Sequence, residues 1–199
     1  MKRKLAIAIF AACGFSSPAW AQLPHQANDP GNVTIDPSGD SGPQQVRLPP
    51  DPEGKAEDLR LHGKCDEAVP ILRRLSNNDG DDIAQYNLGQ CLLDLGKTET
   101  DAARAATLKH EGVAWVLRMA NRGLPNAQSS LISVYLDGEG VTPDPVEAAK
   151  WALIYHGNGT RMAIGMPDIP HDLAVRLDNA LTDKTWDEAQ SRANAWSAN

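Results

Sequence analysis

The sequence is poor in aromatic residues and lacks the alternation of apolar and polar residues that is typical of strands. Aromatic side chains make up 5% of the 199 residues, and both phenylalanines, Phe10 and Phe15, fall near the N-terminus. After residue 21, no apolar run approaches the roughly 20 residues that a transmembrane helix needs. We therefore expect a chain without a membrane span, whose core is built from aliphatic, Trp and Tyr side chains of closely packed helices.

Motifs of catalytic and metal sites are also missing. No serine after residue 21 begins Ser-x-x-Lys or sits in Gly-x-Ser-x-Gly, the nucleophile motifs of penicillin-binding proteins and hydrolases. The five histidines never follow the spacing His-x-x-x-His. The acidic stretch 77–82 resembles the start of a calcium loop, but Leu88 stands where that loop needs a glutamate. We expect no catalytic residue, no cofactor and no metal.

Three cations at positions 2–4 precede an apolar run, 5–12, and Ala19-Trp20-Ala21 supplies small residues for cleavage. This pattern predicts a signal peptide over 1–21 and an exported protein, periplasmic or secreted. In the alternative interpretation, the stretch 11–14 is a lipoprotein cleavage box and Cys13 carries a lipid anchor. An intact mass shifted by a lipid would favour this alternative.

The chain is acidic, and the predicted cleavage makes it more so. Removal of three cations and no acids takes the formal charge from -7 to -10. Such a surface repels phosphate backbones, so we expect no nucleic-acid binding and a basic or neutral protein or peptide as partner.

Composition divides the rest of the chain into two parts. Seven prolines and almost no periodic apolar residues occupy 22–54, which predicts a disordered Pro- and Gly-rich tether over 22–56. From 57 to 199, apolar residues recur at spacings of three and four, which is typical of amphipathic helices. Glycines, capping residues and prolines place the helices at 56–62, 66–77, 82–95, 100–122, 127–136, 145–156, 171–181 and 184–196.

Two helical segments resemble each other. IAQYNLGQCLLDLG at 83–96 aligns with NAQSSLISVYLDGE at 126–139, and Ala114-Trp115 corresponds to Lys150-Trp151. Internal similarity at this spacing is the signature of repeat proteins. The segment 84–89, the turn Gly-Glu-Gly-Val at 138–141 and Glu-Ala-Ala-Lys-Trp at 147–151 resemble the Sel-one-like repeat, a relative of the tetratricopeptide repeat.

The resemblance covers about 57–199 and implies an all-α, right-handed α-solenoid of stacked antiparallel helix hairpins. It implies that the turn at 138–141 joins two helices of one repeat, so Asp137 and Glu139 need no ligand. It also implies that first helices line a concave groove. Helix periodicity sets Tyr86, Gln90 and Asp94 nearly opposite the apolar face of 82–95, and Ser129, Ser133 and Asp137 repeat this arrangement. These six residues are the predicted partner-binding set, and an ordinary solvated face is the alternative.

Two cysteines remain after the predicted cleavage, and an exported chain favours a disulfide between them. If helices 66–77 and 82–95 form a hairpin that turns near Asn78, Cys65 and Cys91 face each other. The resemblance to exported members of the family implies the same bond, because cysteine-rich members bridge paired helices in this way. Two buried free thiols are the alternative.

The sequence therefore predicts a non-enzymatic adaptor of the cell envelope that holds a protein partner in a groove. The alternative function is an envelope enzyme or enzyme regulator acting on peptidoglycan or β-lactam-like substrates, as suggested for some exported relatives. A hydrolysis assay on the purified protein discriminates between them. A purely structural spacer is a third interpretation, which co-purification without an enriched protein would support.

Overall fold

The computed structural model describes residues 51–77 and 81–198. The predicted signal peptide, Cys13 and residues 22–50 of the predicted tether lie outside the described residues. Within those residues the chain forms nine α-helices and no strand, which confirms the all-α prediction. None of the helices found there has the length and apolar character to cross a membrane.

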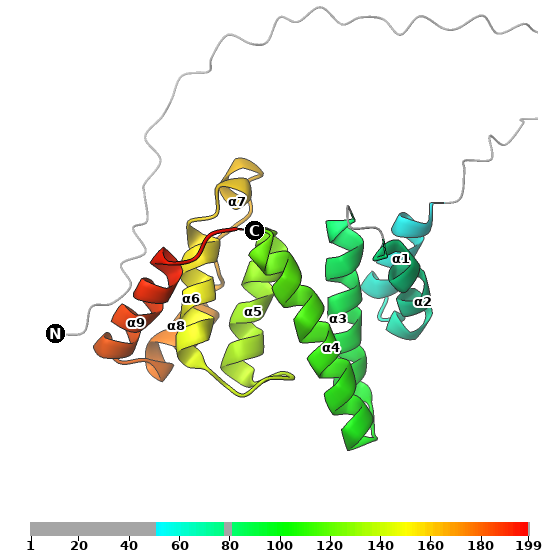
Figure 1. Ribbon diagram of the computed structural model, residues 1–199, viewed down its shortest axis with the longest axis horizontal. Coiled ribbons are helices and arrows are strands. Elements are labelled where there is room, and N and C mark those ends of the chain that lie inside the picture. The colour runs from blue at the N-terminus through cyan, green and yellow to red at the C-terminus, as the bar shows by residue number, and fades with distance from the viewer. Residues whose placement is uncertain (1–50, 78–80, 199) are drawn as a thin grey trace, which may run out of the picture. The chain divides into compact units, whose positions relative to one another are not determined.

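The helices follow one another with short connections (Figure 1). Their bounds are α1 Pro52–Leu61, α2 Cys65–Leu75, α3 Asp82–Thr98, α4 Ala102–Asn121, α5 Pro125–Asp137, α6 Pro145–His156, α7 Gly159–Ala163, α8 His171–Ala180 and α9 Asp183–Asn194. Each helix from α1 to α5 packs against the next one along the chain, α1 also contacts α3, and α6 contacts α8 and α9. In Figure 1 the long helices α3 and α4 lie side by side.

Two buried clusters form the core. The first joins α1, α2 and α3 around Cys65 and Cys91. The second runs from α3 to α9 and includes the fully buried Trp151. Apolar stripes on successive helices are therefore covered by their neighbours, as the periodicity predicted.

The first helix begins earlier than predicted. α1 starts at Pro52 rather than Ala56, so residues 52–56, assigned by composition to the tether, are helical. The carboxylate of Asp51 accepts the backbone N–H of Gly54 at 2.8 Å and caps the helix, and proline suits the first turn because its missing N–H is not needed there. A local capping signal thus outweighs the Pro-rich composition.

Two further helix boundaries differ from those predicted. α2 begins at Cys65, one residue before the predicted start, with Lys64 as its N-cap, so that Pro70 lies inside the helix. Gly96 lies inside α3 instead of ending it. A Cβ atom at Gly96 would lie 2.6 Å from the Lys109 side chain and 3.1 Å from the Ala105 carbonyl oxygen. This glycine therefore permits close packing of α4 on α3.

Two glutamines at matching positions of the similar segments are fully buried, Gln85 in α3 and Gln128 in α5. The Gln85 side chain donates to the carbonyl oxygen of Ser76 at 3.4 Å, and Gln128 donates to that of Ala120 at 3.2 Å. Each glutamine therefore satisfies a carbonyl at the end of the preceding helix, where the last carbonyls have no partner within the helix. These equivalent hydrogen bonds explain why glutamine occurs at the same position of both similar segments.

The turn between α5 and α6 is closed by backbone contacts. Gly138 and Gly140 have φ angles of 74° and 75°, which favour glycine. The N–H groups of Gly138 and Glu139 donate to the Val134 carbonyl oxygen, and Asp144 then caps α6. The glycines are therefore explained by backbone geometry and need no ligand.

Residues 158–170, where no helix was predicted, contain the short helix α7. The guanidinium of Arg161 donates to the carbonyl oxygens of His156 and Met166. The Tyr155 hydroxyl donates to the carbonyl oxygen of Pro167 at 2.7 Å. These bonds from side chains to the backbone tie the segment to the end of α6.

We expect Gly112→Ala to lower the free energy of unfolding by about 1–3 kcal/mol, although alanine favours helices. A Cβ atom at Gly112 in α4 would lie 2.8 Å from the Gly89 carbonyl oxygen and 3.0 Å from the Leu93 backbone nitrogen, so α3 and α4 would have to separate. The control is Gly159→Ala, which meets no atom within 4 Å. Urea unfolding measures both, and equal stability of the two variants would contradict the close-packing argument.

Candidate partner-binding face

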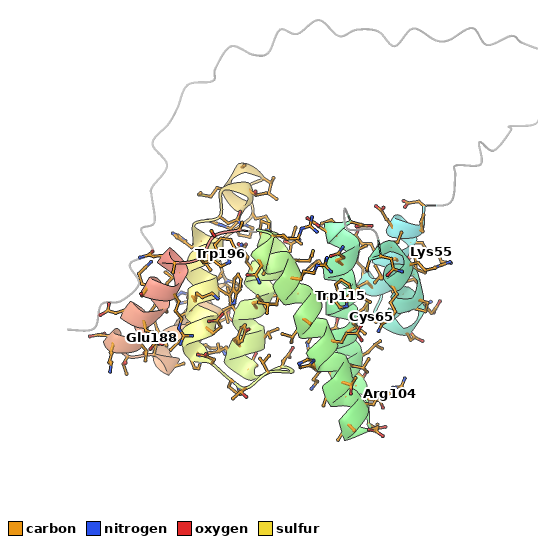
Figure 2. The ribbon with its side chains drawn as sticks, in the orientation of Figure 1. Lys55, Cys65, Arg104, Trp115, Glu188 and Trp196 are labelled. Atoms are coloured by element: carbon orange, nitrogen blue, oxygen red, sulfur yellow. A yellow bond between two sulfur atoms is a disulfide. The ribbon has the colours of Figure 1, made fainter. Side chains whose placement is uncertain are left out.

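The predicted disulfide is present. Cys65 of α2 and Cys91 of α3 are bonded, with Cα atoms 5.0 Å apart. Both residues are buried, and Cys65 lies where α2 faces α3 (Figure 2). The bond therefore holds α2 against α3. Helix α3 carries three of the six residues of the predicted binding set.

Tyr86 connects α3 with α5. Its hydroxyl lies 3.1 Å from the Ser130 Oγ of α5, and its ring packs against the larger core cluster. Burial raises the pKa of the Tyr86 phenol above its ordinary value, while the hydrogen bond to Ser130 and the charge of Arg60 act in the opposite direction. Tyr86 therefore contributes both to the predicted face and, through its ring, to the packing of the larger core cluster.

Gln90 lies one turn further along α3. Its amide nitrogen is buried and has no hydrogen-bond partner among the described residues, and the same holds for the Nε of Arg60 in the neighbouring helix α1. Leaving a buried donor without an acceptor costs about 1–3 kcal/mol. These two donors are therefore the least satisfied polar groups on this face.

The acidic residues of the predicted set have cationic partners. Asp94 is exposed and lies 3.4 Å from the Lys97 ammonium, which also lies 3.3 Å from Glu139. Burial alone would lower the pKa of Lys97, but the carboxylates of Glu139 and Asp94 raise it above its ordinary value. Asp137 of α5 pairs with Arg176 of α8. The negative charges of Asp94 and Asp137 on this face are thus partly neutralised.

Neither of the two predicted serines, Ser129 and Ser133, is the one that contacts Tyr86. Ser129 donates to the Asn126 carbonyl oxygen at 3.0 Å, and Ser133 is half-buried on α5. Ser130, which lies outside the predicted set, is the serine that contacts Tyr86. Arg60 and Asn87 also lie on this face without belonging to the predicted set. Asn87 could have been found from spacing, because it stands three residues before Gln90 and seven before Asp94 on one helix face.

Two hollows lie on the surface near the described helix ends. One, of about 680 Å³, lies beside α6, α7 and α9. Its polar side chains are paired: Asn158 donates to the Gly123 carbonyl oxygen and to Gln128, and Trp196 donates to Asn121. The other, of about 260 Å³, lies between the starts of α1 and α3 and is lined by Asn87. Of the two, the smaller hollow continues the predicted face.

No group of three or more His, Cys, Asp and Glu side chains suited to a metal ion occurs within 51–77 and 81–198. Comparison of the chain with family models, curated proteins and solved structures found no match.

Proposed function

We propose that this chain is a non-enzymatic adaptor of the cell envelope, exported and built as an α-solenoid of the Sel-one-like type. It captures an extended segment of a basic or neutral partner protein on the face formed by the first helices of its hairpins. The buried disulfide suits an oxidising compartment outside the cytoplasm.

One observation carries the proposal. The Nε of Arg60 and the amide nitrogen of Gln90 are buried donors without a partner among the described residues, and they belong to the contacting helices α1 and α3. Buried donors in folded proteins nearly always find acceptors. Carbonyl oxygens of an extended peptide on this face would supply them.

We expect the double variant Arg60→Met/Gln90→Leu to lose partner capture at least about tenfold, because two hydrogen bonds, one of them from a charged group, are removed. Its melting temperature should stay unchanged or rise, since the substitutions also remove two unsatisfied buried donors. Photocrosslinking followed by affinity capture from an envelope extract measures the first effect, and thermal unfolding measures the second.

A matched control is Arg74→Met/Gln190→Leu, which makes the same chemical changes at exposed positions of α2 and α9. It should capture the same proteins as the unmodified chain. Equal capture by both double variants would remove the binding face. Loss of capture accompanied by a large fall in melting temperature would assign Arg60 and Gln90 to folding instead.

A further inference from the structure

The smaller hollow has an apolar floor and an acidic rim. Leu72, Leu75 and Ala84 form the floor, and Leu72 and Ala84 are almost completely buried. Four carboxylates surround it: those of Asp51, Glu53, Glu57 and Asp81. Its volume of about 260 Å³ is below the roughly 300–1,000 Å³ of most small-molecule sites, so one long side chain suits it better than a whole metabolite.

The four carboxylates have no cationic partner among the described residues. The salt bridges of α1 and α2 involve other acids, such as Glu67 with Lys64. Asp51 and Asp81 each accept only a backbone N–H at a helix start. Lys55 stands two residues from both Glu53 and Glu57, and residues so spaced do not share a helix face. The hollow therefore concentrates negative charge that the chain itself does not neutralise.

Asn87 gives independent evidence for a ligand. The residue is 4% exposed and lines the hollow, and its side-chain amide makes no hydrogen bond with the described residues. A side-chain amide both donates and accepts hydrogen bonds, so the Asn87 amide is available to a polar group that enters the hollow. An ammonium or guanidinium group in the hollow would donate to the amide oxygen of Asn87.

We propose that this hollow receives the lysine or arginine side chain of an extended partner peptide. The carboxylates attract the charged end, and the apolar floor covers the methylene stem, as long cationic side chains require. This inference rests on the proposed function, because Asn87 and Gln90 share one face of α3. The peptide would thus place its cation beside Asn87 and its backbone carbonyls at Gln90 and Arg60.

The test uses the full chain and three fluorescein-labelled peptides, Gly-Ser-Val-X-Val-Ser-Gly, in which X is lysine, norleucine or glutamate. We expect the lysine peptide to bind at least about tenfold more tightly than the norleucine peptide, in fluorescence anisotropy at about 50 mM salt. The advantage should shrink at about 300 mM salt. Equal affinities for lysine and norleucine, or lysine-peptide binding weaker than about 1 mM, would overturn the proposal.

Variants locate the effect. Glu57→Gln and Asn87→Ala should each reduce the lysine preference by roughly threefold or more, whereas Glu67→Gln on α2 should leave it unchanged. Glu57 is exposed, so its substitution does not threaten folding, whereas Asp51 and Asp81 cap helices and are avoided. A lysine preference that survives both hollow variants would place the cation elsewhere and overturn the assignment.

The same measurements separate this inference from the proposed function. Peptide binding that depends on Arg60 and Gln90 but shows no lysine preference would overturn the hollow and keep the adaptor. A lysine preference that persists while Arg60→Met/Gln90→Leu leaves capture intact would keep the hollow and remove the proposed face.

Arg47 is the only Lys or Arg within 22–50. Tighter binding of the lysine peptide by Arg47→Gln would identify Arg47 as the occupant and overturn the partner assignment.

Discussion

Replacing Cys65 and Cys91 together by alanine should lower the free energy of unfolding by about 3.5 kcal/mol. This is the contribution that loop-closure entropy predicts for a disulfide between residues so far apart in the sequence. The bonded cysteines are 26 residues apart in sequence, and both are buried in the cluster that joins α1, α2 and α3. This loss is a large share of the roughly 5–15 kcal/mol by which domains are stable. Urea unfolding of the variant and the unmodified chain measures it.

Reduction provides the control for this prediction. Dithiothreitol should destabilise the unmodified chain by a similar amount and leave the double alanine variant unchanged. Thiol titration of the unfolded, unreduced protein should find no reactive group at Cys65 or Cys91. A reduced chain as stable as the oxidised one would contradict the expected contribution of the bond.

Truncating Trp151 to alanine should cost about 3–5 kcal/mol, the typical loss for a large aromatic side chain in a core. The residue is 0% exposed in the cluster that runs from α3 to α9. Its ring meets the Trp196 ring edge-to-face, with centroids 6.1 Å apart, and Figure 2 shows Trp196 beside α6. Loss of Trp151 would therefore loosen the packing of the C-terminal segment on α6 as well. Thermal and urea unfolding measure the cost.

Two comparisons make this prediction specific. Trp151→Phe should cost much less than Trp151→Ala, because a ring remains and the indole N–H, buried without a described partner, is removed. Trp115→Ala should also cost less, since Trp115 is only half-buried and donates to Glu111 at 3.4 Å. Similar losses at positions 115 and 151 would mean that the two tryptophans have equivalent roles in stability despite their different burial.

Much of the helical pattern could be predicted because its signals are local. Asp144 and Pro145 specify the start of α6, and the helix occupies the predicted range. Gly138 ends α5 with a φ angle of 74°, as a glycine at a helix C-terminus suggests. The Cys65–Cys91 pair followed from the expected register of one hairpin. In each case the deciding residues lie within a few positions of one another or within a single helix hairpin.

The candidate face could be predicted only in outline. Spacing placed Tyr86, Gln90 and Asp94 on one side of α3, but the partner of Tyr86 proved to be Ser130, 44 residues away. The contribution of α1, through Arg60 and the acidic rim, depends on its packing against α3. Periodicity within a single helix carries no information about which other helix lies beside it.

The sequence by itself determined the approximate positions of most helices and which of their faces are apolar, because capping, turn geometry and periodicity act over a few residues. The register expected for one hairpin also determined which cysteines pair. Only the tertiary structure decided that Gly96 packs inside α3, that Gln85 and Gln128 satisfy the carbonyls of preceding helices, and that Asn87 lines a hollow. Those outcomes depend on distances between residues from different helices, which are fixed only when the helices pack.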